Sequence, residues 1–220
     1  MNKVLIFDFD GTLADSFDTS KKIVGEIFEQ YRLPRIKTNA DLERLFDGNF
    51  FENTIKFGLD RKLLSIFIND LKDKLEKNRD DIRLFPKTIQ LLEKIKDDNI
   101  IVVITSNMTD LVEYIFSKYR VTCITEVLGA DKEISKIKKI YHIINKFPDK
   151  EYYLIGDTTG DILEGKKAGV KTIAVDWGYH SHAILRKVKP DFLVSNYDDL
   201  AEILEGRGRR SKKLKVKGQK

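Results

Sequence analysis

The segment VLIFDFDGT, residues 4–12, sets how the rest of the chain is interpreted. It begins with a short apolar run, Val4 to Phe7, that polar residues end at once. Such runs are typical of strands buried on both faces of a parallel sheet. Asp8 and Asp10 follow the run two positions apart, so their side chains are expected on the same side of the backbone. The segment therefore predicts a central strand with two carboxylates at its carboxyl end.

Further apolar runs end in the same way, and they predict strands at residues 100–104, 152–155, 171–175 and 192–194. Apolar residues at helical spacing occupy intervals between them, at 89–95 and 137–144, and also follow the last run. Strands alternating with helices indicate an α/β protein with a doubly wound, Rossmann-like parallel sheet.

Residues 14–84 follow a different pattern, because they contain no buried-strand run and their apolar residues recur at helical intervals. Gly48 and Gly58 divide this stretch. We therefore predict that residues 1–13 and 85–205 form an α/β core domain and that residues 14–84 form an inserted helical cap domain.

The positive charge of the chain is concentrated at its end. The chain carries 40 Lys and Arg against 35 Asp and Glu, and residues 206–220 hold eight of the basic residues and no acidic one. Without this segment, 32 basic and 35 acidic residues leave a net charge of −3. Its low apolar content predicts a disordered basic tail. Weak, sequence-blind nucleic-acid binding through this tail is the alternative interpretation.

Other features exclude several classes of protein. No apolar run approaches the roughly 20 residues that cross a bilayer, so no membrane partner is expected. The apolar stretch after Lys3 is too short for a secretory signal. Cys123 is the single cysteine, which rules out an intrachain disulfide. A cytoplasmic location is the resulting expectation.

Polar residues follow three of the predicted strands, and in doubly wound sheets ligands bind beyond the carboxyl ends of the strands. The residues in question are Asp8 and Asp10, Thr105 and Ser106, and Asp157 and Asp161. One of two neighbouring carboxylates can attack phosphorus while the other protonates the leaving oxygen and later activates water.

The remaining groups needed for phosphoryl transfer are also present. Gly11 permits a sharp turn, and the hydroxyls of Thr12 and Thr105 can bind phosphoryl oxygens. A lysine and a divalent cation would neutralise the attack of one anion on another. Asp157 and Asp161 suit a hard, oxygen-liking ion such as Mg²⁺.

Taken together, the motifs resemble those of the haloacid dehalogenase-like (HAD) hydrolase superfamily, subfamily I with a C1-type helical cap, and its phosphoglycolate phosphatase-like members. The resemblance spans residues 1 to about 205 and depends on four segments in the same order as in the family. They are Asp8-Phe9-Asp10-Gly11-Thr12-Leu13, Thr105 after its apolar strand, Ser135-Lys136, and Gly156-Asp157-Thr158-Thr159-Gly160-Asp161.

The resemblance implies a role for each site residue. Asp8 would be the nucleophile that forms an aspartyl-phosphate, and Asp10 the general acid and base. Thr105 and Lys136 would bind the phosphoryl group, with Thr12 and Ser106 as further candidates, and Lys132 remains an alternative for the lysine. The implied Mg²⁺ ligands are the Asp8 carboxylate, the Asp10 backbone carbonyl and Asp157, with Asp161 as ligand or neighbour.

The expected function is Mg²⁺-dependent hydrolysis of a small phosphomonoester metabolite by a monomer or homodimer. Asp10 argues against dehalogenation, because family dehalogenases lack an aspartate at this position. Two alternatives remain: a phosphomutase of the β-phosphoglucomutase kind, and a non-catalytic nucleic-acid-associated protein that uses the basic tail. His180 and His182 are expected to be surface loop residues.

Overall fold

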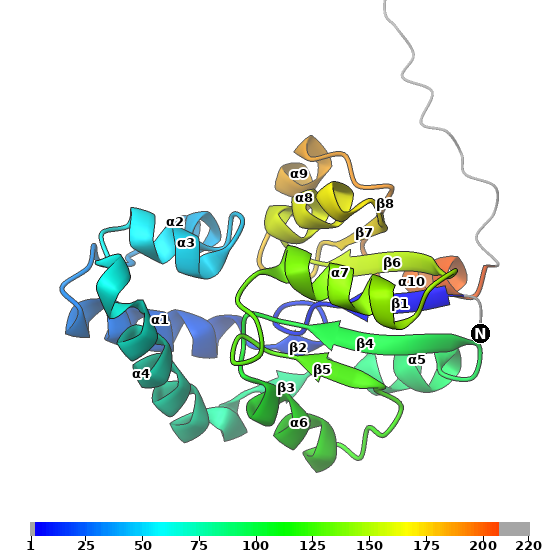
Figure 1. Cartoon of the computed structure of the whole chain (residues 1–220), viewed down its shortest axis with the longest axis horizontal. Helices are drawn as coiled ribbons and strands as arrows, with labels where there is room; N and C mark the ends of the chain where they lie inside the picture. Colours follow the sequence, from blue (N-terminus) through cyan, green and yellow to red (C-terminus); the bar gives the residue numbers. More distant parts are fainter. Residues whose placement is uncertain (1–2, 207–220) are drawn as a thin grey trace, which may run out of the picture.

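The computed structural model describes residues 3–206. Their centre is a six-stranded parallel sheet in the order β5-β4-β1-β6-β7-β8 (Figure 1). The strands are β1 Lys3–Phe7, β4 Asn99–Ile104, β5 Glu126–Leu128, β6 Glu151–Gly156, β7 Lys171–Val175 and β8 Phe192–Val194. The predicted doubly wound α/β fold is confirmed. The predicted disordered tail, residues 206–220, lies outside the described residues except for Gly206.

Strand β1 lies between β4 and β6, and its alternating side chains enter two separate cores. Val4 and Ile6 pack in the core that includes Ile140 of helix α7 (Lys136–Lys146). Leu5 and Phe7 face the opposite side, in the larger core. Val4 to Phe7 are fully buried. An apolar run without polar alternation is therefore what a central strand covered on both faces requires.

Helices cover both faces of the sheet (Figure 1). In addition to α7 they are α5 Thr88–Ile95, α6 Thr109–Lys118, α8 Thr159–Ala168, α9 His182–Lys187 and α10 Tyr197–Leu204. The sequence pattern did not predict β5, which has only three residues and one buried side chain, Val127.

The segment between β1 and β4 is mainly helical, as predicted. It contains α1 Phe17–Gln30, α2 Asn39–Leu45, α3 Phe50–Lys56, η1 Arg61–Leu63, α4 Leu64–Lys77 and η2 Arg79–Asp81. A short antiparallel pair, β2 (Ala14–Asp15) with β3 (Arg83–Leu84), joins its two ends. In Figure 1 these helices lie beyond the carboxyl ends of the sheet strands. The division into domains at residues 13 and 85 stays a prediction.

Within residues 3–206, each helix is too short or too polar to span a bilayer.

Candidate active site

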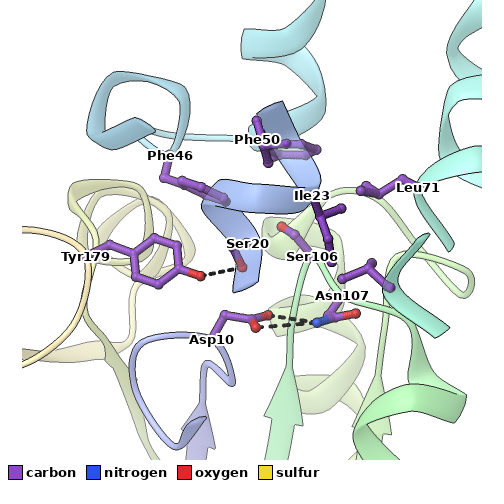
Figure 2. A pocket seen from close by; sticks show the side chains of 11 residues that line it. Asp10, Ser20, Ile23, Phe46, Phe50, Leu71, Ser106, Asn107 and Tyr179 are labelled. Atoms are coloured by element: carbon purple, nitrogen blue, oxygen red, sulfur yellow. Dashed lines mark hydrogen bonds between the residues drawn. The ribbon is translucent and has the colours of Figure 1, made fainter. Parts of the chain in front are cut away.

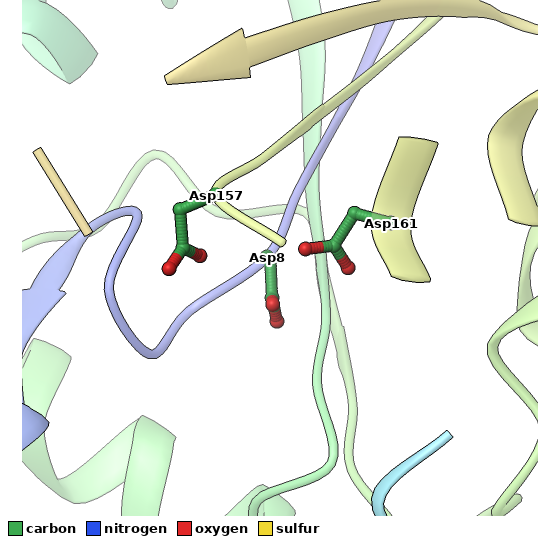
Figure 3. Close-up of side chains that lie close together, drawn as sticks. All are labelled: Asp8, Asp157 and Asp161. Atoms are coloured by element: carbon green, nitrogen blue, oxygen red, sulfur yellow. The ribbon is translucent and has the colours of Figure 1, made fainter. Parts of the chain in front are cut away.

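Three buried aspartates meet at the carboxyl edge of the sheet (Figure 3). Asp8 follows β1, Asp157 follows β6, and Asp161 lies in the first turn of α8. Phe7 pairs with Ile155 across the two strands, which brings segments about 150 residues apart into contact. One carboxylate oxygen from each aspartate lies within 4.8 Å of the others. We call these three residues the acidic cluster.

The position of Asp161 follows from the way helix α8 begins. Thr158 and Asp161 form a reciprocal capping box, in which each side chain accepts a hydrogen bond from the other residue's backbone N–H. This contact occupies Oδ2 of Asp161, and Oδ1 accepts from Lys136. Gly156 makes the approach possible, because a Cβ at this glycine would lie 2.4 Å from Cβ of Asp161.

Lys136 is the cation of the cluster. Its Nζ lies 2.7 Å from Oδ2 of Asp8 and 2.5 Å from Oδ1 of Asp161. The residue begins α7, where the side chain of Ser135 caps the helix. Lys132, the alternative from the sequence, is exposed. Its Nζ lies 3.8 Å from Oδ2 of Asp131, which is not a member of the acidic cluster. The structure therefore brings Lys136, and not Lys132, to the acidic cluster.

Burial controls the protonation of the cluster. It raises the pKa of Asp8 well above its ordinary value, and Lys136 only partly offsets this effect. It also raises the pKa of Asp157 to about 7, with the charge of Asp161 adding to the rise. Burial acts to raise the pKa of Asp161 too, but Lys136 and the hydrogen bonds from Thr158 together lower that pKa. Burial acts to lower the pKa of Lys136, yet Asp161 and Asp8 raise it.

The donor set of the cluster fits a divalent cation. If all three carboxylates are ionised, the single ammonium of Lys136 leaves two negative charges in a buried site. Uncompensated buried charge is costly. The ligand atoms are all carboxylate oxygens, which Mg²⁺ prefers.

Asp157 is held in place by groups from two loops. Its Oδ1 accepts a hydrogen bond from Thr12 Oγ1 at 2.9 Å, and its Oδ2 accepts one from the Tyr179 backbone N–H at 2.7 Å. Gly11 (φ +73°) and Gly178 pass so close that an added Cβ would lie 2.2 and 2.3 Å from Oδ2. The Thr12 hydroxyl, which we expected to bind a phosphoryl oxygen, therefore bonds to Asp157.

Asp10 lies outside the acidic cluster and faces the end of β4. Its carboxylate accepts hydrogen bonds from Asn107 Nδ2 at 3.2 Å and from Thr105 Oγ1 at 3.4 Å. Burial raises the pKa of Asp10, although its hydrogen-bond partners lower it in part. Asn107, the second residue after Thr105, was not predicted as a site residue, because a lone amide carries no distinctive sequence signal.

Two adjoining cavities open onto these residues. The smaller, about 40 Å³, is lined by Asp8, Asp10, Thr105, Ser106 and Lys136, together with other residues; we call it the acidic cavity. The other, about 50 Å³, has Asp10 and Asn107 in its wall and mostly apolar side chains around them (Figure 2). We call it the apolar cavity. The structure thus places each predicted catalytic and phosphate-binding residue except Thr12 on the wall of the acidic cavity.

His180 was expected at the surface, and this prediction is wrong. Its side chain is buried, and the residue is only 2% exposed. Its Nδ1 accepts a hydrogen bond from the Thr159 N–H, so the ring hydrogen is assigned to Nε2, which donates to the Glu43 carbonyl at 2.9 Å. The ring therefore connects the start of α8 to the helical insertion. His182 is exposed, as predicted.

The insertion contacts the core at three further points beside the cluster. Asn49 Nδ2 donates to the Ile134 carbonyl at 3.2 Å, and the Thr159 hydroxyl donates to Asp47. Gly160 also lies against Gly48, since a Cβ at Gly160 would be 2.8 Å from the Gly48 Cα. These contacts hold the loop before α3 over the acidic cavity, whose wall includes Gly48.

Comparison with known proteins agrees with this geometry. Residues 5–175 match the model of a family described as haloacid dehalogenase-like hydrolase. A phosphoglycolate phosphatase of Haemophilus influenzae is 24% identical, covering 92% of this chain and 96% of that protein. A protein named pyrophosphatase PpaX from Oceanobacillus iheyensis is also 24% identical, with coverage of 92% and 96%.

The fold is likewise found in solved structures. A crystal structure described as a predicted phosphatase from Clostridium acetobutylicum superimposes with a TM-score of 0.81 at 22% identity, covering 93% of this chain and 99% of that chain. A haloacid dehalogenase-like hydrolase from Streptococcus pneumoniae gives a TM-score of 0.76 at 21% identity, with coverage of 92% and 98%.

Proposed function

The chain belongs to the haloacid dehalogenase-like hydrolase family, and from this premise we propose that it is a Mg²⁺-dependent phosphatase acting on a small phosphomonoester. The observation that carries the proposal is the acidic cavity. Its wall combines Asp8, Asp10 and Lys136, and Lys136 ion-pairs with Asp8. A nucleophile, a proton donor and a cation for phosphate thus face one space. The names of the relatives, which are phosphatases, support the same reaction class.

Asp8, Asp157 and Asp161 would hold the metal ion, with the backbone carbonyl of Asp10 as the further ligand proposed from the sequence. When bound, Mg²⁺ supplies the positive charge that offsets the approach of a carboxylate to a phosphate. Thr12 and the Tyr179 N–H orient Asp157 for this role through their hydrogen bonds.

In the proposed reaction a carboxylate oxygen of Asp8 attacks phosphorus, and the bond from phosphorus to the ester oxygen breaks. Asp10 gives its proton to the departing oxygen. It later accepts a proton from the water that attacks the aspartyl-phosphate and regenerates Asp8. The raised pKa of Asp10 favours the protonated carboxyl that the first step needs.

Lys136, Thr105 and Ser106 are proposed to bind the phosphoryl oxygens, because all three line the acidic cavity with Asp8. Thr105 and Asn107 also position the Asp10 carboxyl through their hydrogen bonds. The loop before α3 covers the cavity and reduces the access of water during the reaction.

The proposal is tested by measuring phosphate release from a panel of small phosphoesters, with excess Mg²⁺ and with a chelator. Asp8→Asn should reduce release by at least about 10³-fold, and removal of the metal should do the same. Asp176→Asn is the control, since Asp176 ends β7 but bonds to His182 and Ser195 and not to the cluster. Equal release by the wild-type protein and Asp8→Asn would refute the mechanism.

The same panel separates the alternatives. A phosphomutase would form a bisphosphate without net release of phosphate. A non-catalytic nucleic-acid-associated protein would tolerate Asp8→Asn and lose its function when residues 206–220 are deleted. The cytoplasmic location and the monomeric or dimeric state stay predictions from the sequence.

A further inference from the structure

We propose that the substrate's leaving group is uncharged and predominantly apolar, a small alkyl alcohol, and that it binds in the apolar cavity beside Asp10. This inference rests on the proposed function, because it concerns the part of the ester that phosphoryl transfer releases. It differs from what the name of one relative suggests, since the leaving group of phosphoglycolate carries a carboxylate.

The wall of the apolar cavity comes mainly from the helical insertion. Its apolar side chains are Ile23, Val24, Phe46, Phe50, Leu71 and Leu75. In Figure 2 the rings of Phe46 and Phe50 lie on the side of the cavity opposite Asp10 and Asn107. Burial of a methylene group against such a wall is favourable, so the cavity selects for hydrocarbon.

The apolar cavity continues the acidic cavity. Asp10, Ser106 and Tyr179 line both of them, as do Phe46 and Phe50. A phosphoryl group beside Asp8 and Lys136 would therefore have its ester oxygen near Asp10, the proposed proton donor. Substituents on that oxygen extend past Asp10 into the apolar cavity. The chemistry of this cavity thus determines which leaving group fits.

Among the residues described as lining the apolar cavity, none is a lysine, an arginine or a histidine. The carboxyl in its wall is that of Asp10, which offers a bound carboxylate no positive charge in either protonation state. Of the lysines on the same helices, Lys22 donates to Asn78 and Lys74 pairs with Glu26. A carboxylate held here without a cationic partner would pay a desolvation penalty.

The neutral polar groups of the cavity are already organised around one another. Tyr179 Oη donates to Ser20 Oγ at 2.8 Å, and the Asn107 amide donates to Asp10. Hydroxyls such as those of Ser20 and Ser106 can bind a neutral oxygen of the ligand, but they do not balance a full charge. The wall therefore tolerates a hydroxyl or ether group and disfavours an acid.

The test compares kcat/KM for two esters of similar size, propyl phosphate and phosphoglycolate, with Mg²⁺ present. We expect propyl phosphate to be preferred by at least about 10-fold. The intrinsic reactivity of the esters favours the opposite order, because the alcohol of phosphoglycolate is the more acidic leaving group. Lengthening the alkyl chain from ethyl to propyl should raise kcat/KM by about fourfold for the added methylene.

A second test introduces a positive charge into the wall of the apolar cavity and measures the change in substrate preference. Leu71→Lys places an ammonium at the wall of the cavity and should shift the ratio of the two kcat/KM values at least about 10-fold toward phosphoglycolate. Leu71→Met keeps the wall apolar and should leave the ratio within about twofold of wild type. An unchanged ratio in Leu71→Lys, with the variant folded by circular dichroism, would count against the assigned position of the leaving group.

The outcomes separate this inference from the proposed function. If the wild-type protein releases phosphate in an Asp8-dependent reaction but prefers phosphoglycolate, the inference is wrong and the proposed function stands. If neither these esters nor the wider panel yield phosphate, the proposed function is wrong and the inference falls with it.

Discussion

Replacement of Asp157 by asparagine should stabilise the protein when no metal ion is bound. Asp157 is fully buried, and burial raises its pKa from 3.8 to about 7 in the folded protein. A carboxyl whose pKa is raised on folding destabilises the protein progressively as the pH increases from the unfolded to the folded value. Between about pH 4 and about pH 7 the penalty grows to about 4 kcal/mol.

The asparagine should fit the same place at little cost. Its single amide oxygen can accept from the Tyr179 N–H, which lies 2.7 Å from Oδ2 of Asp157. Its NH₂ group would then face the Thr12 hydroxyl, which can rotate and accept instead of donating. We allow about 1 kcal/mol for this rearrangement. The expected net gain in the free energy of unfolding is on the order of 3 kcal/mol at about pH 8.

The measurement is urea unfolding of the wild-type protein and Asp157→Asn with a chelator, at about pH 4 and at about pH 8. At the lower pH, where the wild-type carboxyl is protonated, the gain should be lost, and the variant should be less stable than wild type by up to the rearrangement cost of about 1 kcal/mol. Added Mg²⁺ should stabilise the wild-type protein and have little effect on the variant.

Asp176→Asn is the matched control and should not change the response to Mg²⁺, because Asp176 lies outside the acidic cluster. A variant that is less stable than wild type at about pH 8 with chelator would refute the electrostatic reasoning. If Mg²⁺ stabilised Asp157→Asn as much as it stabilises the wild-type protein, the assignment of Asp157 as a metal ligand would be refuted.

Three further outcomes follow from the site. Asp10→Asn should lower kcat by about 10²–10⁴-fold for alkyl phosphates and less for p-nitrophenyl phosphate, whose leaving group needs no proton; steady-state kinetics with both esters checks this. His180→Phe should lower the free energy of unfolding by about 1–3 kcal/mol, because it leaves the Thr159 N–H and the Glu43 carbonyl without their partner. The control His182→Ala should change it by less than about 0.5 kcal/mol. In urea unfolding, Gly11→Ala should destabilise the protein far more than Gly169→Ala, which should cost about 1 kcal/mol. Both glycines have positive φ, but only at Gly11 would the added Cβ collide with the Asp157 carboxylate.

The sequence by itself determined five of the six strands of the sheet and the acids at its edge. Residues 4–7 predict a strand correctly because a strand covered on both faces must be apolar at every position, and this property is visible locally. Asp8 and Asp157 could be assigned to the same edge for a related reason. Parallel strands end on one side of a sheet, so residues that follow two such strands come together whatever their separation along the chain.

The tertiary structure decided the partners of individual side chains. The sequence favours Lys136 and leaves Lys132 as an alternative, and the packing of α7 directs Lys136 to Asp8 and Asp161. Thr12 bonds to Asp157, and His180 is buried between core and insertion. Such contacts depend on neighbours far away in the sequence and have no local periodicity.

The shape of the apolar cavity was also beyond the reach of the sequence. Ile23 and Leu71 are among the apolar residues at helical intervals in residues 14–84, and both are buried in the structure. Only the packing of α1 against α4 turns part of that apolar surface into the wall of a cavity beside Asp10. The chemistry of the reaction is therefore readable from strand ends, because it uses residues next to backbone elements that pack predictably. The space for the leaving group is set by helices whose relative placement depends on contacts along the whole insertion.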